Sequence, residues 1–299
     1  MSNTNRLTTT RMESLAVELI QCTDPSIQPR LEHDRIATTQ MQHRINLLQA
    51  WFGSLDAAKD NLEGKTVLEI GCGQGDMTVA LAWAVGFSGT VHAIDPAPPD
   101  YGSPETLQEA QQRISRSPLG ARIKWKRCEP VEALKRDPLL KSADFIVLAH
   151  SLLYMDSMDY IANLLRALAR DPGVSTTPEA TSSTLLVAEW GMRASHEGAR
   201  AHLYAVQAQA VRPLRKGNVQ LYLEPNVTVE LASSAGWKVE KETWVNSPDL
   251  DDGKWEVAAA MRIPLEDDTD GATGDFLEEL GSQTLGPTRC MDVWTVVLQ

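Results

Sequence analysis

From Lys65 onward, short apolar segments alternate with segments of helical periodicity, and this rhythm limits the possible folds more than any other feature of the sequence. The apolar segments are rich in Val, Ile and Leu, as strands buried on both faces are. A repeated strand-helix alternation predicts an α/β domain with one mostly parallel sheet and helices on both of its faces. The seven predicted strands are residues 66–70, 90–94, 122–125, 144–149, 184–189, 238–245 and 291–298.

The last two predicted strands are separated by a long acidic crossover at residues 249–279. This separation favours antiparallel pairing at one end of the sheet. The crossover holds 11 acidic and two basic residues, a charge of −9, whereas the whole chain carries −12 from 28 Lys and Arg against 40 Asp and Glu. The remaining residues therefore carry −12 − (−9) = −3. We expect the crossover to be a solvated surface segment beside a nearly neutral domain.

Residues 1–62 precede the first predicted strand and have helical patterns. Apolar residues lie on one face of a predicted helix at 11–20, and they recur at three- and four-residue spacing in a second predicted helix at 31–55. Two Pro-containing turns separate these helices. We therefore expect residues 1–62 to form a helical N-terminal cover or lid on a single large α/β domain at 63–299.

Composition restricts the partners and the location of the protein. The net charge and the lack of a basic stripe argue against nucleic-acid binding. No apolar run approaches the roughly 20 residues that span a bilayer, and the polar N-terminus lacks the apolar core of a signal peptide. The four cysteines are scattered without a CxxC pair, which disfavours structural zinc and a disulfide framework. We expect a cytoplasmic protein without a metal that acts on a small molecule, and a homodimer remains open.

The segment at 67–76, VLEIGCGQGD, is where we expect the chemistry to lie. An apolar strand passes directly into three glycines and then into a helix, so that the backbone can turn sharply and present helix N–H groups to a ligand. The glycine spacing is GxGxG, with Glu69 two positions before the first glycine, whereas dinucleotide-binding folds use GxGxxG. This difference disfavours a pyrophosphate and a nicotinamide oxidoreductase, and it suits a cationic cofactor beside a carboxylate.

This segment resembles the first motif, E/DxGxGxG, of the class I S-adenosylmethionine-dependent methyltransferases. Asp95, 20 residues after Gly75, matches the acidic residue that ends the second strand of that family. In finer detail, GCGQGD, the AIDPA segment and residues 250–256 resemble fungal methyltransferases of small-molecule secondary metabolism. The resemblance implies a Rossmann-like fold, S-adenosylmethionine as cofactor, and methyl transfer to an O, N or C atom of a natural-product acceptor. The Asn-Pro-Pro-Tyr signature of nucleobase methyltransferases is absent, since the fourth strand ends in AHSLLY.

The resemblance also implies which residues hold the cofactor. Asp95 would accept hydrogen bonds from the ribose hydroxyls, a role that suits an acceptor-only carboxylate. The glycine loop would face the aminoacyl part, and Cys72 would be a small residue between glycines rather than a nucleophile. The expected cofactor-binding residues are Glu69, Gly71, Cys72, Gly73, Gly75, Asp95, Pro96, Glu129, His150 and Ser151.

Residues at the carboxyl ends of the later strands are candidates for the acceptor site, because open α/β sheets bind ligands there. His150 ends the fourth strand and is the candidate general base if the acceptor must lose a proton, since an imidazole has an ordinary pKa near 6.5. The expected catalytic residues are His150, Tyr154 and Glu189. The expected substrate-binding residues are Gln40, His43, Arg44, Trp190, His202 and Trp255.

Two other functions remain open from the sequence. The cofactor could be held for its positive charge while the enzyme cyclises or isomerises a substrate without net methyl transfer. The chain could also be a non-catalytic regulatory protein on the same fold. The glycine loop and Asp95 are both intact, which makes the regulatory alternative less favoured.

Overall fold

The computed structural model describes residues 3–28, 32–169, 183–214, 217–263, 272–283 and 287–299. These residues form a seven-stranded sheet in the order β3-β2-β1-β4-β5-β7-β6. Strand β7 runs antiparallel to β5 and β6, and the other neighbouring pairs are parallel. The predicted α/β class and the Rossmann-like, mostly parallel sheet are confirmed. The strands are β1 Thr66–Ile70, β2 Thr90–Asp95, β3 Ile123–Arg127, β4 Phe145–Ala149, β5 Thr184–Trp190, β6 Val239–Val245 and β7 Val293–Leu298.

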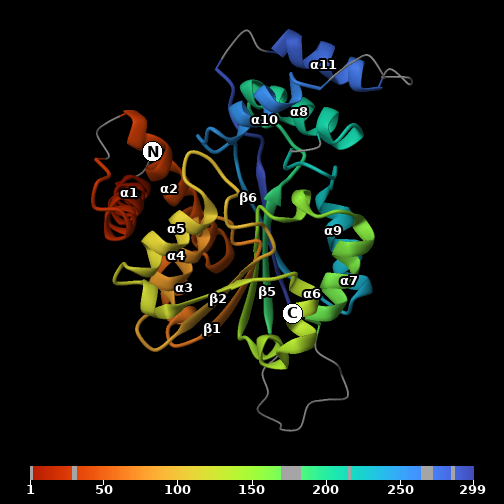
Figure 1. The fold of residues 1–299 in the computed structure, drawn as a ribbon. Helices are drawn as coiled ribbons and strands as arrows, with labels where there is room; N and C mark the ends of the chain where they lie inside the picture. The colour runs from red at the N-terminus through yellow and green to blue at the C-terminus, as the bar shows by residue number, and fades with distance from the viewer. Residues whose placement is uncertain (1–2, 29–31, 170–182, 215–216, 264–271, 284–286) are drawn as a thin grey trace.

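Helices cover both faces of the sheet and the end at which the parallel strands finish (Figure 1). One face carries α3 Leu55–Leu62, α4 Asp76–Ala84 and α5 Leu107–Ser115, and the other carries α6 Pro130–Arg136, α7 Met158–Leu168 and α9 Pro225–Ser234. Above the carboxyl ends of the strands lie α8 Arg200–Val211, α10 Asp252–Ala260 and α11 Ala272–Gln283. The N-terminal helices α1 Asn3–Thr23 and α2 Glu32–Phe52 pack against each other at one side of this end.

The central strands are apolar throughout because helices exclude water from both of their faces. Val67 of β1, Ile146 of β4 and Val187 of β5 are fully buried. Helix α7 begins where the Ser157 hydroxyl accepts the N–H of Tyr160, and its buried side is a stripe of Ile and Leu at helical spacing. Such local caps fix where each helix leaves the sheet.

Helix α2 is bound to the sheet by polar contacts at its C-terminal end. The buried Trp51 indole N–H donates to the carbonyl oxygen of Val187 over 3.0 Å. Lys241 of β6 donates to the carbonyl oxygens of Ala50 and Trp51, where the negative end of the helix dipole favours a cation. These contacts hold the preceding turns of α2 at the carboxyl edge of the sheet.

The prediction of a single helix at 31–55 was wrong at the C-terminal end of that helix. Helix α2 stops at Phe52, and Gly53 adopts a φ of 89° that a helix cannot continue through. Ser54 then begins α3, since its hydroxyl accepts the N–H of Ala57.

The prediction that the acidic crossover is a solvated surface segment was also wrong for its first half. Helix α10 folds back onto the domain and buries Asp251 and Glu256. Asp251 is stabilised by ion pairs with Arg35 and Lys254, and the Glu256 carboxylate accepts a hydrogen bond of 2.7 Å from Gln209. Residues 264–271 of the crossover lie outside the described part of the chain. No helix that the structure describes is both long and apolar enough to cross a bilayer.

Replacement of Trp51 by Phe should lower the free energy of unfolding by about 1–3 kcal/mol, because the Val187 carbonyl loses a buried hydrogen bond while most of the ring volume remains. Urea denaturation measures the change. The matched control is Trp83→Phe, since Trp83 is half-buried and its indole N–H donates no hydrogen bond within the described residues. Equal losses in the two variants would show that packing, and not the hydrogen bond, attaches α2 to β5.

Candidate active site

The loop between β1 and α4 requires glycine at two positions. Gly71 has a φ of 77°, and a Cβ there would lie 2.5 Å from the Cβ of Ser151, which follows β4. Gly75 has a φ of 102°, and its Cβ would lie 2.7 Å from the ring of Trp125. Side chains would therefore be strained by the backbone conformation and excluded by close neighbours. The loop leaves backbone groups, rather than side chains, to face a ligand.

Asp95, at the end of β2, holds this loop in place. One of its carboxylate oxygens accepts the N–H of Gly73 over 2.8 Å, and the other accepts the N–H of Ala97 over 2.8 Å. A cavity of about 350 Å³ opens beside Asp95, and its lining includes Gln111 and Trp125. Gln111 also donates to the carbonyl oxygen of Gly73. The cavity thus lies against the glycine loop, where the resemblance places the adenosine part of the cofactor.

Glu69 lies beneath the loop with its side chain buried. Its carboxyl group accepts a hydrogen bond of 2.6 Å from the Thr78 hydroxyl on α4. Burial raises the pKa of Glu69 to about 7, although Thr78 and the charge of Arg44 oppose this shift. Near neutral pH, Glu69 therefore takes and releases a proton easily.

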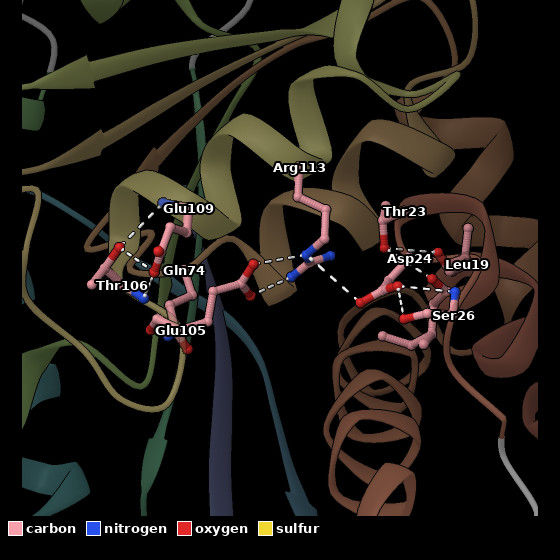
Figure 2. Close-up of polar contacts among 10 residues, drawn as sticks. Leu19, Thr23, Asp24, Ser26, Gln74, Glu105, Thr106, Glu109 and Arg113 are labelled. Carbon is pink, nitrogen blue, oxygen red and sulfur yellow. Dashed lines mark hydrogen bonds and ion pairs between the residues drawn. The ribbon is translucent and has the colours of Figure 1, made fainter.

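A chain of polar contacts joins the N-terminal helices to this loop (Figure 2). Arg113 of α5 binds Glu105 through two hydrogen bonds of 2.9 and 2.7 Å, and it lies 3.9 Å from Asp24 in the turn after α1. The carbonyl oxygen of Glu105 accepts a hydrogen bond from the Gln74 side chain of the glycine loop. One guanidinium thus connects the turn after α1 with the segment that borders the glycine loop.

A second cluster of buried polar groups lies at the carboxyl ends of β4 and β5. The Nε2 atoms of His43 and His150 are 2.8 Å apart, and the Nδ1 of His150 is 3.5 Å from a carboxylate oxygen of Glu189. The Trp190 ring packs on His150 at a centroid distance of 4.5 Å, and His202 meets its other side edge-on at 4.7 Å. Glu189, His150 and His43 therefore lie in one polar line, in which the two imidazoles are within hydrogen-bond distance and the His150 Nδ1 faces Glu189 without a hydrogen bond.

Burial controls the protonation of this line. It lowers the pKa of His43 and of His150 well below the ordinary value, with a further contribution from the Arg44 charge, so both imidazoles are neutral at pH 7. Burial raises the pKa of Glu189 to about 7, even though its carboxylate accepts the N–H groups of Trp190 and Leu152. The line therefore holds two neutral bases and one carboxyl that titrates near neutrality.

Helix α10 supplies two carboxylates, and α2 and α8 each supply a glutamine that binds one of them. Gln40 of α2 donates a hydrogen bond of 2.5 Å to Asp252, and Gln209 of α8 donates to Glu256. Tyr154 is 39% exposed, and its pKa is raised well above the ordinary value by burial and by the charges of Glu256, Asp252 and Glu189. The three carboxyls therefore lie close enough to Tyr154 to influence its phenol, and the residue itself is partly exposed.

The structure gathers many of the predicted site residues and leaves others apart. The gathered residues are Gly71, Gly73, Gly75, Asp95 and Ser151 around the glycine loop, and Gln40, His43, Arg44, His150, Tyr154, Glu189, Trp190 and His202 around the carboxyl ends of β4 and β5. Cys72 is buried within the loop, and Pro96 follows Asp95.

Two predicted site residues, Glu129 and Trp255, are not among those that the structure gathers. The Glu129 carboxylate caps α6 by accepting the N–H groups of Val131 and Glu132, and it also accepts the Tyr160 hydroxyl. Trp255 on α10 is half-exposed.

Sequence reasoning left Asp252, Glu256 and Gln209 out of the expected site residues, although Glu256 adjoins Trp255 in a segment that could cover the substrate. The Asp252-Gly253 pair was visible as the start of a segment, but a charged helix start is ordinary in a surface helix. The contact between Gln40 and Asp252 joins residues 212 positions apart, which no local pattern reveals.

Replacement of Glu69 by Gln should stabilise the ligand-free protein increasingly as the pH rises. Since the folded-state pKa of Glu69 is raised to about 7 from 4.5, the wild type loses stability between those two pH values, by up to about 3 kcal/mol. Gln keeps the size of the side chain and an acceptor for Thr78 without that loss. Urea denaturation of both proteins between pH 5.5 and 7.5 measures the effect, and a difference that stays constant with pH would contradict it.

Comparisons with known proteins agree with this site. Residues 67–171 match the profile of the family described as "Methyltransferase domain". The chain is 26% identical to the methyltransferase phomM of Diaporthe leptostromiformis, over 89% of this chain and 78% of that protein. It is 25% identical to the methyltransferase phomM′ of the same organism, with the same coverage.

A solved structure resembles the whole fold. It is the cyclopropane-fatty-acyl-phospholipid synthase-like protein from Lactobacillus casei ATCC 334, with a TM-score of 0.76 and 29% identity over 94% of this chain and 98% of that one. The glycine loop that faces a ligand through its backbone, the adjoining Asp95 and the cavity beside them suit the cofactor that the sequence predicts. The chain is a class I S-adenosylmethionine-dependent methyltransferase, and S-adenosylmethionine is its cofactor.

Proposed function

We propose that the enzyme methylates an O, N or C atom of a natural-product-like small molecule, and that the acceptor gives up a proton during the reaction. The acceptor would lie between α2, α8 and α10 and the carboxyl ends of β4 and β5. The observation that carries the proposal is the line Glu189–His150–His43, which places two neutral bases and a titratable carboxyl beside the glycine loop.

The line can move a proton in one direction. If His43 donates its Nε2–H to His150, the Nδ1–H of His150 faces Glu189 over 3.5 Å, and a small approach of the ring would turn this contact into a hydrogen bond. In that arrangement the Nδ1 of His43 carries a free lone pair. That nitrogen has no hydrogen-bond partner in the described part of the chain. A proton accepted there would pass through His150 to the Glu189 carboxylate, whose pKa of about 7 allows it to hold the proton near neutral pH. His150 would then act as the middle of a relay rather than alone.

The cofactor supplies an electrophilic methyl group on a sulfonium, so that the protein chiefly has to align the acceptor and exclude water. We propose that Glu69, Gly71, Cys72, Gly73, Gly75, Asp95, Pro96 and Ser151 surround the cofactor. Tyr154, Trp190 and His202 would form the wall of the acceptor site, with Gln40 placed by its bond to Asp252. Cofactor contact by Glu129 and acceptor contact by Trp255 remain predictions.

The relatives and the charge support a small acceptor. The phomM proteins are fungal methyltransferases, and their similarity spans most of this chain. The chain has a net charge of −12, and the acceptor site itself is lined with carboxylates, which would repel the phosphates of a nucleic acid. We therefore propose a role in secondary metabolism, in the cytoplasm. A homodimer remains a prediction.

Replacement of Glu189 by Gln should lower kcat about 10²- to 10⁴-fold with a much smaller effect on the affinity for S-adenosylhomocysteine, because the relay loses its final proton acceptor. The wild-type kcat should fall as the pH drops through about 7, where Glu189 becomes protonated, and the variant should lack this inflection. Rates of methyl transfer measured from pH 5.5 to 9 test both statements. His150→Ala should lower kcat in the same range.

The same assay separates the alternatives. Incubation with labelled cofactor and a metabolite extract should yield S-adenosylhomocysteine and a methylated product in equal amounts. Conversion of a substrate while the cofactor stays intact would favour a cyclase or isomerase. A wild-type profile without an inflection near pH 7 would remove Glu189 from the mechanism.

A further inference from the structure

Arg44 has an unusual environment for a cation within a protein. It lies on α2 one residue after His43 and is only partly exposed, and its Nη1 is buried without a hydrogen-bond partner. Among the described residues no carboxylate oxygen lies within ion-pair distance of its guanidinium, whereas Arg35 on the same helix is paired with Asp251. A guanidinium has five N–H donors in a planar fork, and those on the buried Nη1 of Arg44 have no acceptor among the described residues.

Carboxylates nevertheless surround Arg44 at longer range. Its charge opposes the rise that burial causes in the pKa of three carboxyls, those of Glu69 in β1, Glu189 in β5 and Asp252 in α10. Arg44 also acts on His150 and on Tyr154 after β4. The guanidinium is therefore close to these groups but, in the described part of the chain, bound to none of them, which leaves a gap in its hydrogen bonding that a ligand can fill.

The ligand that suits this gap is an α-amino acid group. A planar carboxylate can accept two parallel hydrogen bonds from a guanidinium. A simple anion would be repelled by the three neighbouring carboxylates, whereas an α-amino acid brings an ammonium that these carboxylates attract. Phosphate and sulfate lack such a compensating charge.

The methionine part of S-adenosylmethionine carries such an α-amino acid group, and the resemblance places it at the glycine loop. Arg44 acts on Glu69, directly below the glycine loop, and on His150, which adjoins Ser151. Gly71 and Ser151 are in contact, and His43, the neighbour of Arg44, lies 2.8 Å from His150, so the ends of β1 and β4 meet close to this part of α2. We propose that Arg44 binds the α-carboxylate of the methionine part of the cofactor, so that α2 forms one wall of the cofactor site. This inference rests on the cofactor and does not depend on the acceptor or on the proton relay.

Two cofactor relatives separate this contact from the rest of the site. S-adenosylhomocysteine carries the amino acid group, whereas 5′-methylthioadenosine keeps the adenosine and the sulfur but lacks that group. We expect Arg44→Met to weaken S-adenosylhomocysteine binding about 10- to 100-fold, as loss of a charged hydrogen-bonded pair does, and to change 5′-methylthioadenosine binding less than about twofold. Arg44→Lys should lie between the two, because it keeps the charge but not the fork. Isothermal titration calorimetry on the purified full-length chain gives both affinities.

Arg35→Met is the matched control on the same helix, and it should leave the ratio of the two affinities unchanged. Thermal unfolding of each variant shows whether it is folded. Equal weakening of both ligands by Arg44→Met would indicate a structural role and overturn the proposal. Unchanged binding of S-adenosylhomocysteine with a raised KM for the acceptor would also overturn it and assign Arg44 to the acceptor. Failure of the wild type to bind S-adenosylhomocysteine would instead contradict the assigned cofactor.

Discussion

The contact between Gly71 and Ser151 is the constraint on which the site depends. No side chain larger than hydrogen fits at position 71, so the ends of β1 and β4 can approach each other closely. These strands are neighbours at the point where the order of the parallel sheet reverses, and chains leaving them diverge to opposite faces. The glycine loop and His150 consequently lie on the two sides of one crevice. The distance between the glycine loop and the end of β4 is thereby fixed by the backbone rather than by flexible side chains.

Exclusion of water determines the electrostatic character of this crevice. It raises the pKa of Glu69 and of Glu189 to about 7, which is near the ordinary pKa of histidine. It lowers the pKa of His43 and of His150 well below that ordinary value. A buried site full of fixed charges would cost the fold much of its stability. Groups that can become neutral reduce that cost, and they are also the groups that can exchange protons near pH 7.

The parts of the protein that local sequence determines could be predicted. Periodicity and spacing along the chain predict the alternation of strands and helices, the glycine loop and the position of Asp95. The structure places Asp95 against Gly73. The placement of α10 could not be predicted in this way. Asp252 and Glu256 look like the solvated start of an acidic helix until α2 and α8 provide Gln40 and Gln209 from distant parts of the chain. The residue that contacts a buried carboxylate can lie far away in the sequence, so the local charge pattern alone predicts that the carboxylate is exposed.

The backbone at His150 lies in the left-handed region, with a φ of 53°. Among residues with a side chain, Asn, Asp and His are the ones found there most often, whereas β-branched and bulky residues are strained. A substitution at position 150 therefore changes the backbone preference as well as the imidazole. His150→Asn would remove the ring and keep a residue that this backbone conformation accepts.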